Sequence, residues 1–402
     1  MYDVAIVGAG PAGAWTARGL ARLGARVLLL DGSHPREKPC GGGVTGRALA
    51  LVADAVAPAS LSAVAIASAR FVDTSRLDQG GRPRASQVAL PAGSGLIVSD
   101  RRQFDRRLLE AACEAGTTFV AARATGVERL SPGFRLRTTK GAFDAGLLVG
   151  ADGANSLVRR QVAHPIERHD LSIATGFYVH GVSSDEIVIE LVEDPPGYLW
   201  SFPRTDHLAI GICAQADAGA TAGALRARAA RWIRELGLAP GAPLTPYGWP
   251  IPSLGSRTLA QPTLCGPDWL LVGDAAGLVD PITREGIFFA LQSAGFAATA
   301  LGKGDPASYG AAVRASIMPE LQRAAAFKDG FFRPRFRRLF LDALERSAPI
   351  RAVMADLVAG TQPYRGLKRR LLGTLEIGLA LRLLTERRRD THLAPGRAHQ
   401  HG

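Results

Sequence analysis

Apolar residues form a short run at the very start of the chain. Residues 2–7 read Tyr-Asp-Val-Ala-Ile-Val and end at a glycine, which predicts a buried parallel strand. The next apolar positions fit a helix over residues 11–23, with a proline in its first turn, and a second buried strand over residues 26–30. A strand, a glycine turn, a helix and a strand within about 30 residues make a βαβ unit.

The hydrophobic pattern changes period further along the chain. Apolar and polar positions predict strands near residues 64–72 and 86–90, and a helix over 102–115 with apolar residues on one face. Alternating runs over 125–139 predict further strands, and residues 141–149 form another apolar strand that leads into a glycine-rich turn.

Residues 165–260 have a different character. Stretches of period two at 171–180, 186–192 and 207–213 predict an antiparallel sheet. A buried strand at 269–272 and a helix over 285–301 then resume the first pattern. We therefore expect an α/β fold, in which a doubly wound Rossmann-type domain carries an inserted antiparallel β domain and a helical C-terminal extension.

Composition narrows the class of protein. The 402 residues, of which 47% are apolar and 21% charged, exclude disorder for most of the chain and leave room for two or three domains. The four cysteines lie far apart, at positions 40, 113, 213 and 265, which argues against a zinc ribbon, an iron–sulfur pattern or a disulfide framework. With no basic leader and no apolar run of 18 residues, we expect a cytoplasmic protein that does not cross the membrane.

Charge is concentrated at the C-terminal end. The net charge is +12, and residues 331–402 hold 15 Lys/Arg against 6 Asp/Glu, a net of +9. A near-neutral body with a basic tail predicts one cationic surface for an anionic partner and argues against general nucleic-acid binding. Two interpretations stay open, an interfacial helix on the inner face of a membrane or a solvated face of a helix bundle. The basic residues are Arg333, Arg335, Arg337, Arg338, Arg365, Lys368, Arg369, Arg370, Arg387, Arg388 and Arg389.

A GxGxxG motif stands between the first strand and the first helix. Gly8 permits the tight turn, Gly10 lets the backbone approach a pyrophosphate, and Gly13 lets helix and strand pack closely. Asp31 closes the next strand, where it can accept hydrogen bonds from ribose hydroxyls and would repel a 2′-phosphate, so FAD or NAD is favoured over NADP. The predicted cofactor residues of this turn are Gly8, Gly10, Pro11, Ala12 and Gly13.

Two later segments favour FAD over NAD. One contains Asp152 and Gly153, and the other places Gly273 and Asp274 after a strand. Asp274 is suited to accept hydrogen bonds from the hydroxyls of the ribityl chain, although a turn aspartate or an N-cap would have the same pattern. Gly286 and Ile287 open a long apolar helix whose N–H groups can stabilise negative charge on a reduced flavin. No second GxGxxG follows, so we expect electrons from docking NAD(P)H or from ferredoxin.

Together these motifs resemble the geranylgeranyl reductase family of the glutathione-reductase-type FAD superfamily, over residues 1 to about 310. The narrower parts of the resemblance are the run from Lys38 through Pro-Cys-Gly-Gly-Gly and the aromatic run that starts at Tyr198. Family members often have Thr-Gly-Glu-Gly where this chain has Thr-Arg-Glu-Gly, with Arg284 at the second position. The motifs that carry the resemblance are residues 8–13, 38–43, Arg101-x-x-Phe104-Asp105, Asp152-Gly153, Tyr198-x-Trp200-x-Phe202-Pro203 and 273–286.

The resemblance implies a division of the chain and further site residues. It adds Gly41, Gly42, Gly43, Val44 and Arg101 to the FAD site. Cys40 is a candidate proton donor or flavin contact, and a small buried residue of a cofactor loop is the alternative. The expected parts are an FAD domain at 1–70, 100–164 and 265–310, a substrate domain at 71–99 and 165–264, and a basic helical extension at 311–402.

Aromatic residues of the predicted sheet suggest the substrate. Alternation puts Tyr198, Trp200 and Phe202 on one face of a strand, and with Phe177 and others they could line a long apolar pocket or an ordinary sheet core. The resemblance favours a prenylated lipid or prenyl diphosphate, reduced at carbon–carbon double bonds by hydride from reduced flavin. A monooxygenase or halogenase of the same fold, or a non-catalytic prenyl-binding escort protein, are the alternatives. Histidine spacing predicts no metal, and the oligomeric state is left open. The remaining predicted substrate residues are Tyr247 and Trp249.

Overall fold

The computed structural model describes residues 1–374. Its first sheet has five parallel strands in the order β8-β2-β1-β11-β17, the strand order of a Rossmann-type half. Two further strands extend it in an antiparallel meander through β11. The strands are β1 (Tyr2–Val7), β2 (Val27–Leu30), β8 (Thr118–Val120), β9 (Ala124–Arg129), β10 (Phe134–Thr138), β11 (Gly141–Gly150) and β17 (Trp269–Leu271).

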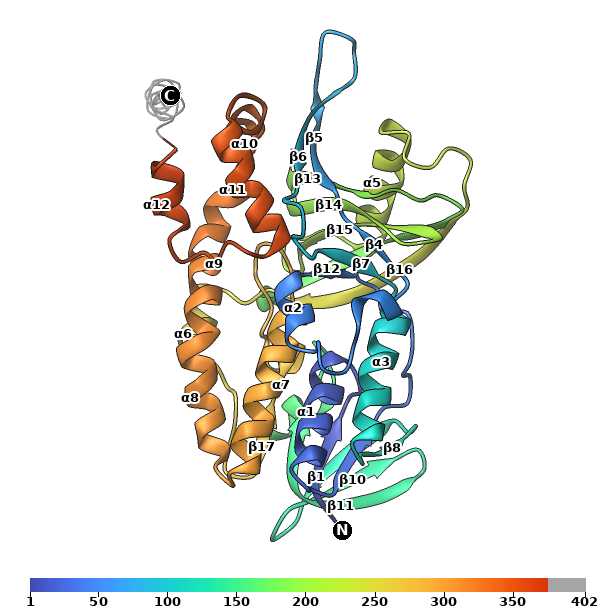
Figure 1. The fold of residues 1–402 in the computed structure, drawn as a ribbon, viewed down its shortest axis with the longest axis vertical. Coiled ribbons are helices and arrows are strands. Elements are labelled where there is room, and N and C mark those ends of the chain that lie inside the picture. The colour runs from blue at the N-terminus through green and yellow to red at the C-terminus, as the bar shows by residue number, and fades with distance from the viewer. Residues whose placement is uncertain (375–402) are drawn as a thin grey trace, which may run out of the picture.

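Helices cover this sheet and complete its core. The first helix, α1 (Pro11–Arg22), packs between α3 (Arg101–Glu114) and α7 (Ile287–Gly302), as Figure 1 shows. Its start at Pro11 matches the sequence prediction, because a proline in the first turn sacrifices no helix hydrogen bond. The three leucines of β2, residues 28–30, are fully buried beneath these helices. The expected mixed α/β fold is confirmed.

The second sheet has seven strands in the order β16-β12-β15-β14-β13-β5-β6, all antiparallel neighbours except β13 and β5. Helix α5 (Ala222–Glu235) packs against it through Trp232, whose Nε1 donates to Glu190 Oε2 at 2.7 Å. The strands are β5 (Ser68–Leu77), β6 (Pro83–Ala89), β12 (Leu171–His180), β13 (Glu186–Glu193), β14 (Pro196–Pro203), β15 (His207–Gln215) and β16 (Leu244–Pro252).

The single strand expected near residues 64–72 is wrong, because two strands of different sheets lie there. β4 (Ala63–Ala65) pairs with β7 (Ile97–Ser99), which also pairs with β3 (Gly43–Val44). The chain changes partner between β4 and β5, where the Ile66 N–H donates to Leu96 and the Ala67 N–H to Asp185. Hydrophobic period does not reveal such a change of sheet.

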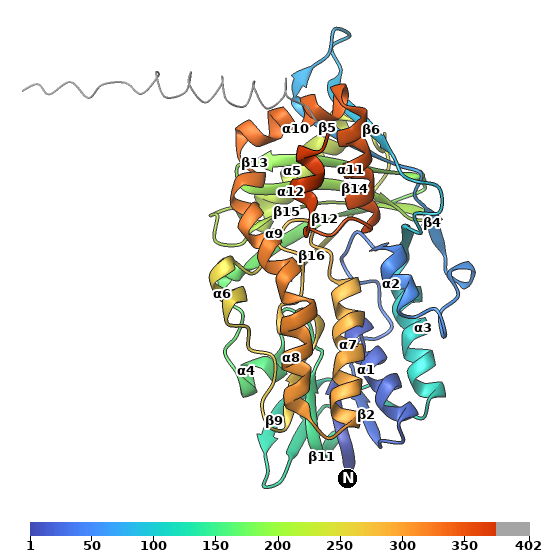
Figure 2. The ribbon, with the colours of Figure 1, turned by 60° about the vertical axis from the view of Figure 1, so that its left-hand side comes forward.

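The C-terminal helices run along one side of the molecule, from beside α7 up to the second sheet (Figures 1 and 2). Helices α10 and α11 contact β6 there. None of the helices in residues 1–374 is long and apolar enough to cross a bilayer, and Arg387, Arg388 and Arg389 lie outside the described residues. The remaining elements are α2 (Gly46–Ala50), η1 (Pro58–Ser60), α4 (Leu157–Val162), η2 (Arg168–Asp170), α6 (Ser256–Ala260), η3 (Gly273–Ala276), α8 (Pro306–Ser316), α9 (Met318–Phe331), α10 (Pro334–Arg346), α11 (Ala348–Ala359) and α12 (Leu367–Leu372).

Candidate flavin and substrate site

The glycine turn between β1 and α1 has the geometry of a phosphate-binding turn. Gly8 has φ +102°, and a Cβ on Gly13 would lie 1.8 Å from the Gly8 carbonyl oxygen, so both positions need glycine. Gly10 is the N-cap of α1, and no atom lies within 4 Å of the place where its Cβ would be. Open space in front of free helix N–H groups fits a pyrophosphate.

Asp31 holds this turn in place. Its Oδ2 accepts from the Ala9 N–H at 2.9 Å, and its Oδ1 accepts from the Ser33 N–H at 2.7 Å. Asp31 therefore joins the end of β2 to the phosphate turn. This structural role is additional to the ribose contact that the sequence predicts for Asp31. Burial alone would raise the pKa of Asp31, but the His34 ring and the Ala9 N–H outweigh it and the pKa is lowered.

His34 links two carboxylates that the sequence does not connect. Its Nδ1 lies 3.4 Å from Asp31 Oδ2, and its Nε2 lies 3.3 Å from Asp105 Oδ2. Burial opposes protonation of the ring, yet the nearby carboxylates of Asp105 and Asp31 raise its pKa overall. Asp105 also forms a bidentate pair with Arg101, at 3.0 Å from Nε to Oδ1 and 2.8 Å from Nη2 to Oδ2. The pair is buried, which makes His34 and Asp105 part of the site's framework.

The loop with Cys40 and three glycines lies beside this framework. Cys40 Sγ accepts from the Gly42 N–H at 3.3 Å and contacts the Arg101 guanidinium. Gly41 and Gly43 pack against the ring of Phe202, since a Cβ on either would lie 3.2 and 3.3 Å from it. The structure thus brings the predicted cofactor loop onto the predicted substrate strand.

Arg204 fixes the same loop from the second sheet. It is 1% exposed, its Nη2 donates to the Cys40 carbonyl at 3.0 Å, and it lies 3.3 Å from Glu37 Oε1. Burial and a hydrogen bond to Asp100 raise the pKa of Glu37 to about 7, although Arg204 acts against this. Arg204 and Glu37 are absent from the sequence prediction, and the only signal for Arg204 is its place directly after the aromatic run.

Asp274 and Gly286 meet where the sequence expects the flavin ring to lie. Lys38 Nζ lies 3.0 Å from Asp274 Oδ2, and a Cβ on Gly286, the N-cap of α7, would lie 3.2 Å from Asp274 Oδ1. Ile287 is the first residue of α7. Asp274 therefore faces both the cysteine loop and the start of α7.

Asp152 and Gly153 flank the phosphate turn. A Cβ on Gly8 would lie 2.8 Å from the Asp152 nitrogen. The Asp152 carboxylate accepts from the Leu157 N–H at 2.6 Å and from the Ser156 hydroxyl, next to the start of α4. In this structure the carboxylate stabilises its own turn.

Four of the five predicted substrate aromatics belong to one cluster over the second sheet. Trp200 and Tyr247 are 4% and 8% exposed and both contact the backbone at Gly211. Tyr198 and Phe202 pack against the same cluster. Phe177 does not, because it packs under α5 with the opposite face of the sheet, so its predicted place in the pocket is wrong. Trp249 stacks under the guanidinium of Arg36 at 4.7 Å.

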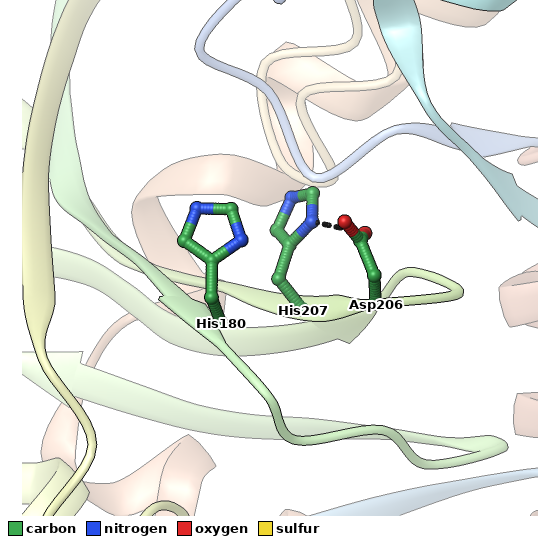
Figure 3. Close-up of side chains that lie close together, drawn as sticks. All are labelled: His180, Asp206 and His207. Carbon is green, nitrogen blue, oxygen red and sulfur yellow. Dashed lines mark hydrogen bonds and ion pairs between the residues drawn. The ribbon is translucent and has the colours of Figure 1, made fainter.

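Strand pairing brings together one cluster that spacing along the chain does not reveal. His180 ends β12 directly opposite His207 at the start of β15, with ring centroids 4.9 Å apart. Asp206 Oδ1 lies 2.7 Å from His207 Nδ1, and Figure 3 shows the three side chains side by side, with possible ligand atoms within 4.8 Å of one another. The expectation of no metal rests on histidine spacing and stays a prediction.

The family is shown by comparison with known sequences. The model of the FAD binding domain family matches residues 1–304, so the chain belongs to this family of flavin oxidoreductases. It is 29% identical to a geranylgeranyl diphosphate reductase of Rhodobacter capsulatus over 91% of this chain and 95% of the relative. It is 30% identical to a menaquinone reductase of Mycolicibacterium smegmatis over 77% of this chain and 78% of the relative. The resemblance predicted from the motifs is confirmed.

Solved structures share the fold. A geranylgeranyl bacteriochlorophyll reductase-like protein of Thermoplasma acidophilum superposes with a TM-score of 0.75 and 22% identity, covering 93% of this chain and 99% of that chain. A flavin-dependent brominase superposes with a TM-score of 0.68 and 19% identity, covering 92% of this chain and 98% of that chain. Identities this low establish the fold and leave the reaction to the site residues.

Proposed function

We propose that the protein is an FAD-dependent reductase of carbon–carbon double bonds in a prenyl chain of geranylgeranyl type. The turn at Gly8, Gly10 and Gly13 would hold the pyrophosphate of FAD, and Asp274 and Gly286 would face its ribityl and ring portions. When bound and reduced, the flavin supplies hydride to one alkene carbon. The remaining tasks fall to the residues of this chain.

Those tasks are to bind the alkene, exclude water and deliver a proton. Trp200, Tyr247 and Phe202 would form the apolar wall, with Tyr198 and Trp249 at its ends. The second alkene carbon needs a proton, which the Cys40 thiol or a water held near it would supply. Arg204 and Arg101 act as positioning residues, because both contact the segment that carries Cys40.

One observation carries the proposal: Gly41 and Gly43 of the cofactor loop pack directly on Phe202 of the aromatic strand. A flavin lying along the loop would therefore have the aromatic cluster as its neighbour, which is the arrangement that reduction of an apolar chain requires. The predicted division into an FAD domain (1–70, 100–164 and 265–310), a substrate domain (71–99 and 165–264) and an extension (311–402) follows the same arrangement and belongs to the proposal.

The brominase likeness makes a flavin halogenase the second candidate. Against it stands Tyr198-x-Trp200-x-Phe202-Pro203, where halogenases have Trp-x-Trp-x-Ile-Pro. An escort protein without flavin would not require the open space before Gly10 or the position of Asp274 beside Gly286, since both features serve cofactor binding in the proposal. A yellow purified protein with flavin absorbance would exclude the escort function.

The direct test is anaerobic. The bound flavin is reduced by NADPH, NADH or reduced ferredoxin, each alone, and candidate prenyl lipids are then analysed by mass spectrometry for added hydrogen pairs. Hydrogen addition with one donor supports the proposal and identifies the donor. Oxidation or halogenation of an aromatic substrate in air, with no hydrogen addition, would contradict it and favour the second candidate.

A further inference from the structure

Arg284 adopts a backbone conformation that its side chain does not favour. It is the one non-glycine residue with positive φ, +63°, among residues 1–374. It directly precedes Glu285 and the N-cap of α7. Strain of this kind persists when the surrounding structure enforces it, and it is concentrated at functional positions.

The guanidinium of Arg284 extends from this loop to the aromatic cluster. It lies beside the sulfur of Cys213, which is fully buried in β15, and its charge acts on the nearby Tyr198 hydroxyl. Tyr198 in turn donates its hydroxyl to the Thr283 carbonyl at 2.7 Å, so the loop is fixed against β14. The cation therefore lies at the end of the proposed prenyl pocket.

Within the described residues Arg284 makes no ion pair, although Asp280 is near enough for the two charges to attract. No carboxylate in the described part of the chain lies within ion-pair distance of it, and its buried Nε has no hydrogen-bond partner. Nη1 donates only to the Pro281 carbonyl. Asp280 and Glu285, the acids of the same loop, are hydrogen-bonded to other groups.

Asp280 Oδ1 accepts from the N–H groups of Ile282 and Thr283, at 2.7 and 2.9 Å, and its carboxyl lies beside the Tyr364 side chain. Glu285 accepts from the Thr45 hydroxyl at 3.0 Å and pairs with Arg47. Burial raises the pKa of both carboxyls, although Arg284 opposes this at Asp280 and Arg47 opposes it at Glu285. A cation so placed leaves a position for an external anion.

We infer that Arg284 binds a phosphate ester on the substrate and selects phosphorylated prenyl compounds over neutral ones. A guanidinium matches phosphate with two parallel N–H donors, whereas a hydrocarbon chain has no use for a buried cation. The inference rests on the proposed function, which it deepens by naming the head group. The phosphate could belong to a prenyl diphosphate or to a prenylated phospholipid.

The test measures binding to the FAD-loaded full-length protein through the change in flavin absorbance. The ligands are geranylgeranyl diphosphate, a digeranylgeranyl glycerophospholipid, neutral geranylgeraniol and inorganic diphosphate. Arg284→Gly relieves the positive φ and is expected to fold. This variant should bind both phosphate-bearing lipids with an affinity about tenfold or more lower than that of the wild type. Its affinity for geranylgeraniol should stay within about twofold of the wild-type value. Arg284→Lys should retain part of the preference, and exposed Arg234→Gln on α5 should change nothing.

Two results would overturn the inference. One is an unchanged preference for phosphate in Arg284→Gly, and the other is tighter binding of geranylgeraniol than of either phosphate-bearing lipid by the wild type. The lipid that binds more tightly to the wild type identifies the source of the phosphate. Inorganic diphosphate competes for Arg284 even if no alkene is ever reduced, so failure of the proposed reaction is distinguishable from failure of this inference. A flavin potential that shifts in Arg284→Gly without any loss of phosphate preference would assign Arg284 to the flavin instead.

Discussion

The guanidinium of Arg204 lies against the backbone of Gly42, so that a Cβ on Gly42 would be 2.2 Å from its Nη1. Gly42 also has φ +79°, in the left-handed region. Arg204 cannot withdraw freely, because it is 1% exposed and held by Glu37 and the Cys40 carbonyl. The second sheet thus sets the conformation of the cysteine loop.

Gly42→Ala should therefore destabilise the protein more than its backbone angle alone explains. A positive φ costs alanine about 1–2 kcal/mol, and the steric conflict with Arg204 should add about 1–3 kcal/mol. Gly219→Ala is the matched control, with φ +81° and open space around its Cβ. Urea unfolding of both variants measures the difference, and equal losses would mean that Arg204 yields without cost.

Gly10→Glu should remove FAD without unfolding the protein. The position has φ −67° and no atom within 4 Å of its Cβ, so the side chain fits but places a carboxylate where the pyrophosphate is expected. Gly10→Ala adds only a methyl group and should lose less flavin than Gly10→Glu, and exposed Gly330→Glu controls for the added charge. Flavin absorbance per mole of folded protein is the measurement. Normal flavin content in Gly10→Glu would move the cofactor site elsewhere.

Cys40→Ser should leave FAD bound and lower turnover, if the thiol delivers the proton. A hydroxyl can replace the sulfur as acceptor for the Gly42 N–H, so the loop should keep its shape. A loss of about tenfold or more in kcat with little change in KM is expected for a group that acts in the chemical step. Cys113→Ser, at an exposed thiol, is the control. Unchanged turnover would make Cys40 a packing residue.

His34 should make stability depend on pH. Its pKa in the folded protein is raised above the ordinary value of a histidine, about 6.5, so its contribution is fully present below that pH and is lost as pH rises through the raised pKa. The free energy of unfolding of wild type relative to His34→Gln should therefore fall as the pH is raised from about 6.5 into the alkaline range. Exposed His164→Gln serves as the control. A constant difference across this range would show that the ring is neutral between Asp31 and Asp105.

Vesicle binding should reveal whether the basic extension meets a membrane. In α12 the side chains of Lys368 and Arg369 are exposed, beside Leu371 and Leu372 at 41% and 70% exposure. Each such cation contributes about 1 kcal/mol near an anionic surface. The double change of Lys368 and Arg369 to Gln should weaken sedimentation with anionic vesicles, and rising salt should weaken it further.

The control for that experiment is the double change of Arg231 and Arg234 to Gln on α5, which removes equal charge elsewhere. Arg370 is unsuitable as a probe because it pairs with Asp356 at 2.5 Å, so changing it would disturb the fold. Equal binding to neutral and anionic vesicles, insensitive to salt, would favour the helix bundle with a solvated face. Arg387, Arg388 and Arg389 lie outside the described residues.

The first βαβ unit could be predicted almost to the residue, because its signals are local. The predicted strand over 2–7 is β1 without change, and α1 ends at Arg22, one residue before the predicted end. The spacing of the turn glycines is an equally local signal, although the structure restricts Gly8 through Ala151, far along the chain, and only Gly13 through its own turn.

The contacts that build the site could not be predicted in this way. His34 meets Asp105, Arg204 meets Glu37, and His180 meets His207 through sheet order and register. These contacts depend on which strands become neighbours, and the periodicity of a single sequence does not determine which strands pair. The predicted place of Phe177 in the pocket is wrong for a related reason. Alternation assigns residues to two faces of a strand and does not say which face α5 covers.

The side chain of Tyr364, between α11 and α12, lies beside the buried carboxyl of Asp280 in the loop before α7. Its backbone N–H is held by Glu320 Oε2 at 2.7 Å. The C-terminal extension therefore packs directly against the loop that carries Arg284. A proteolytic cut before Tyr364 would remove the support that this residue gives to the loop at the end of the proposed pocket. A protein shortened at that point should therefore be assayed for substrate choice as well as for solubility.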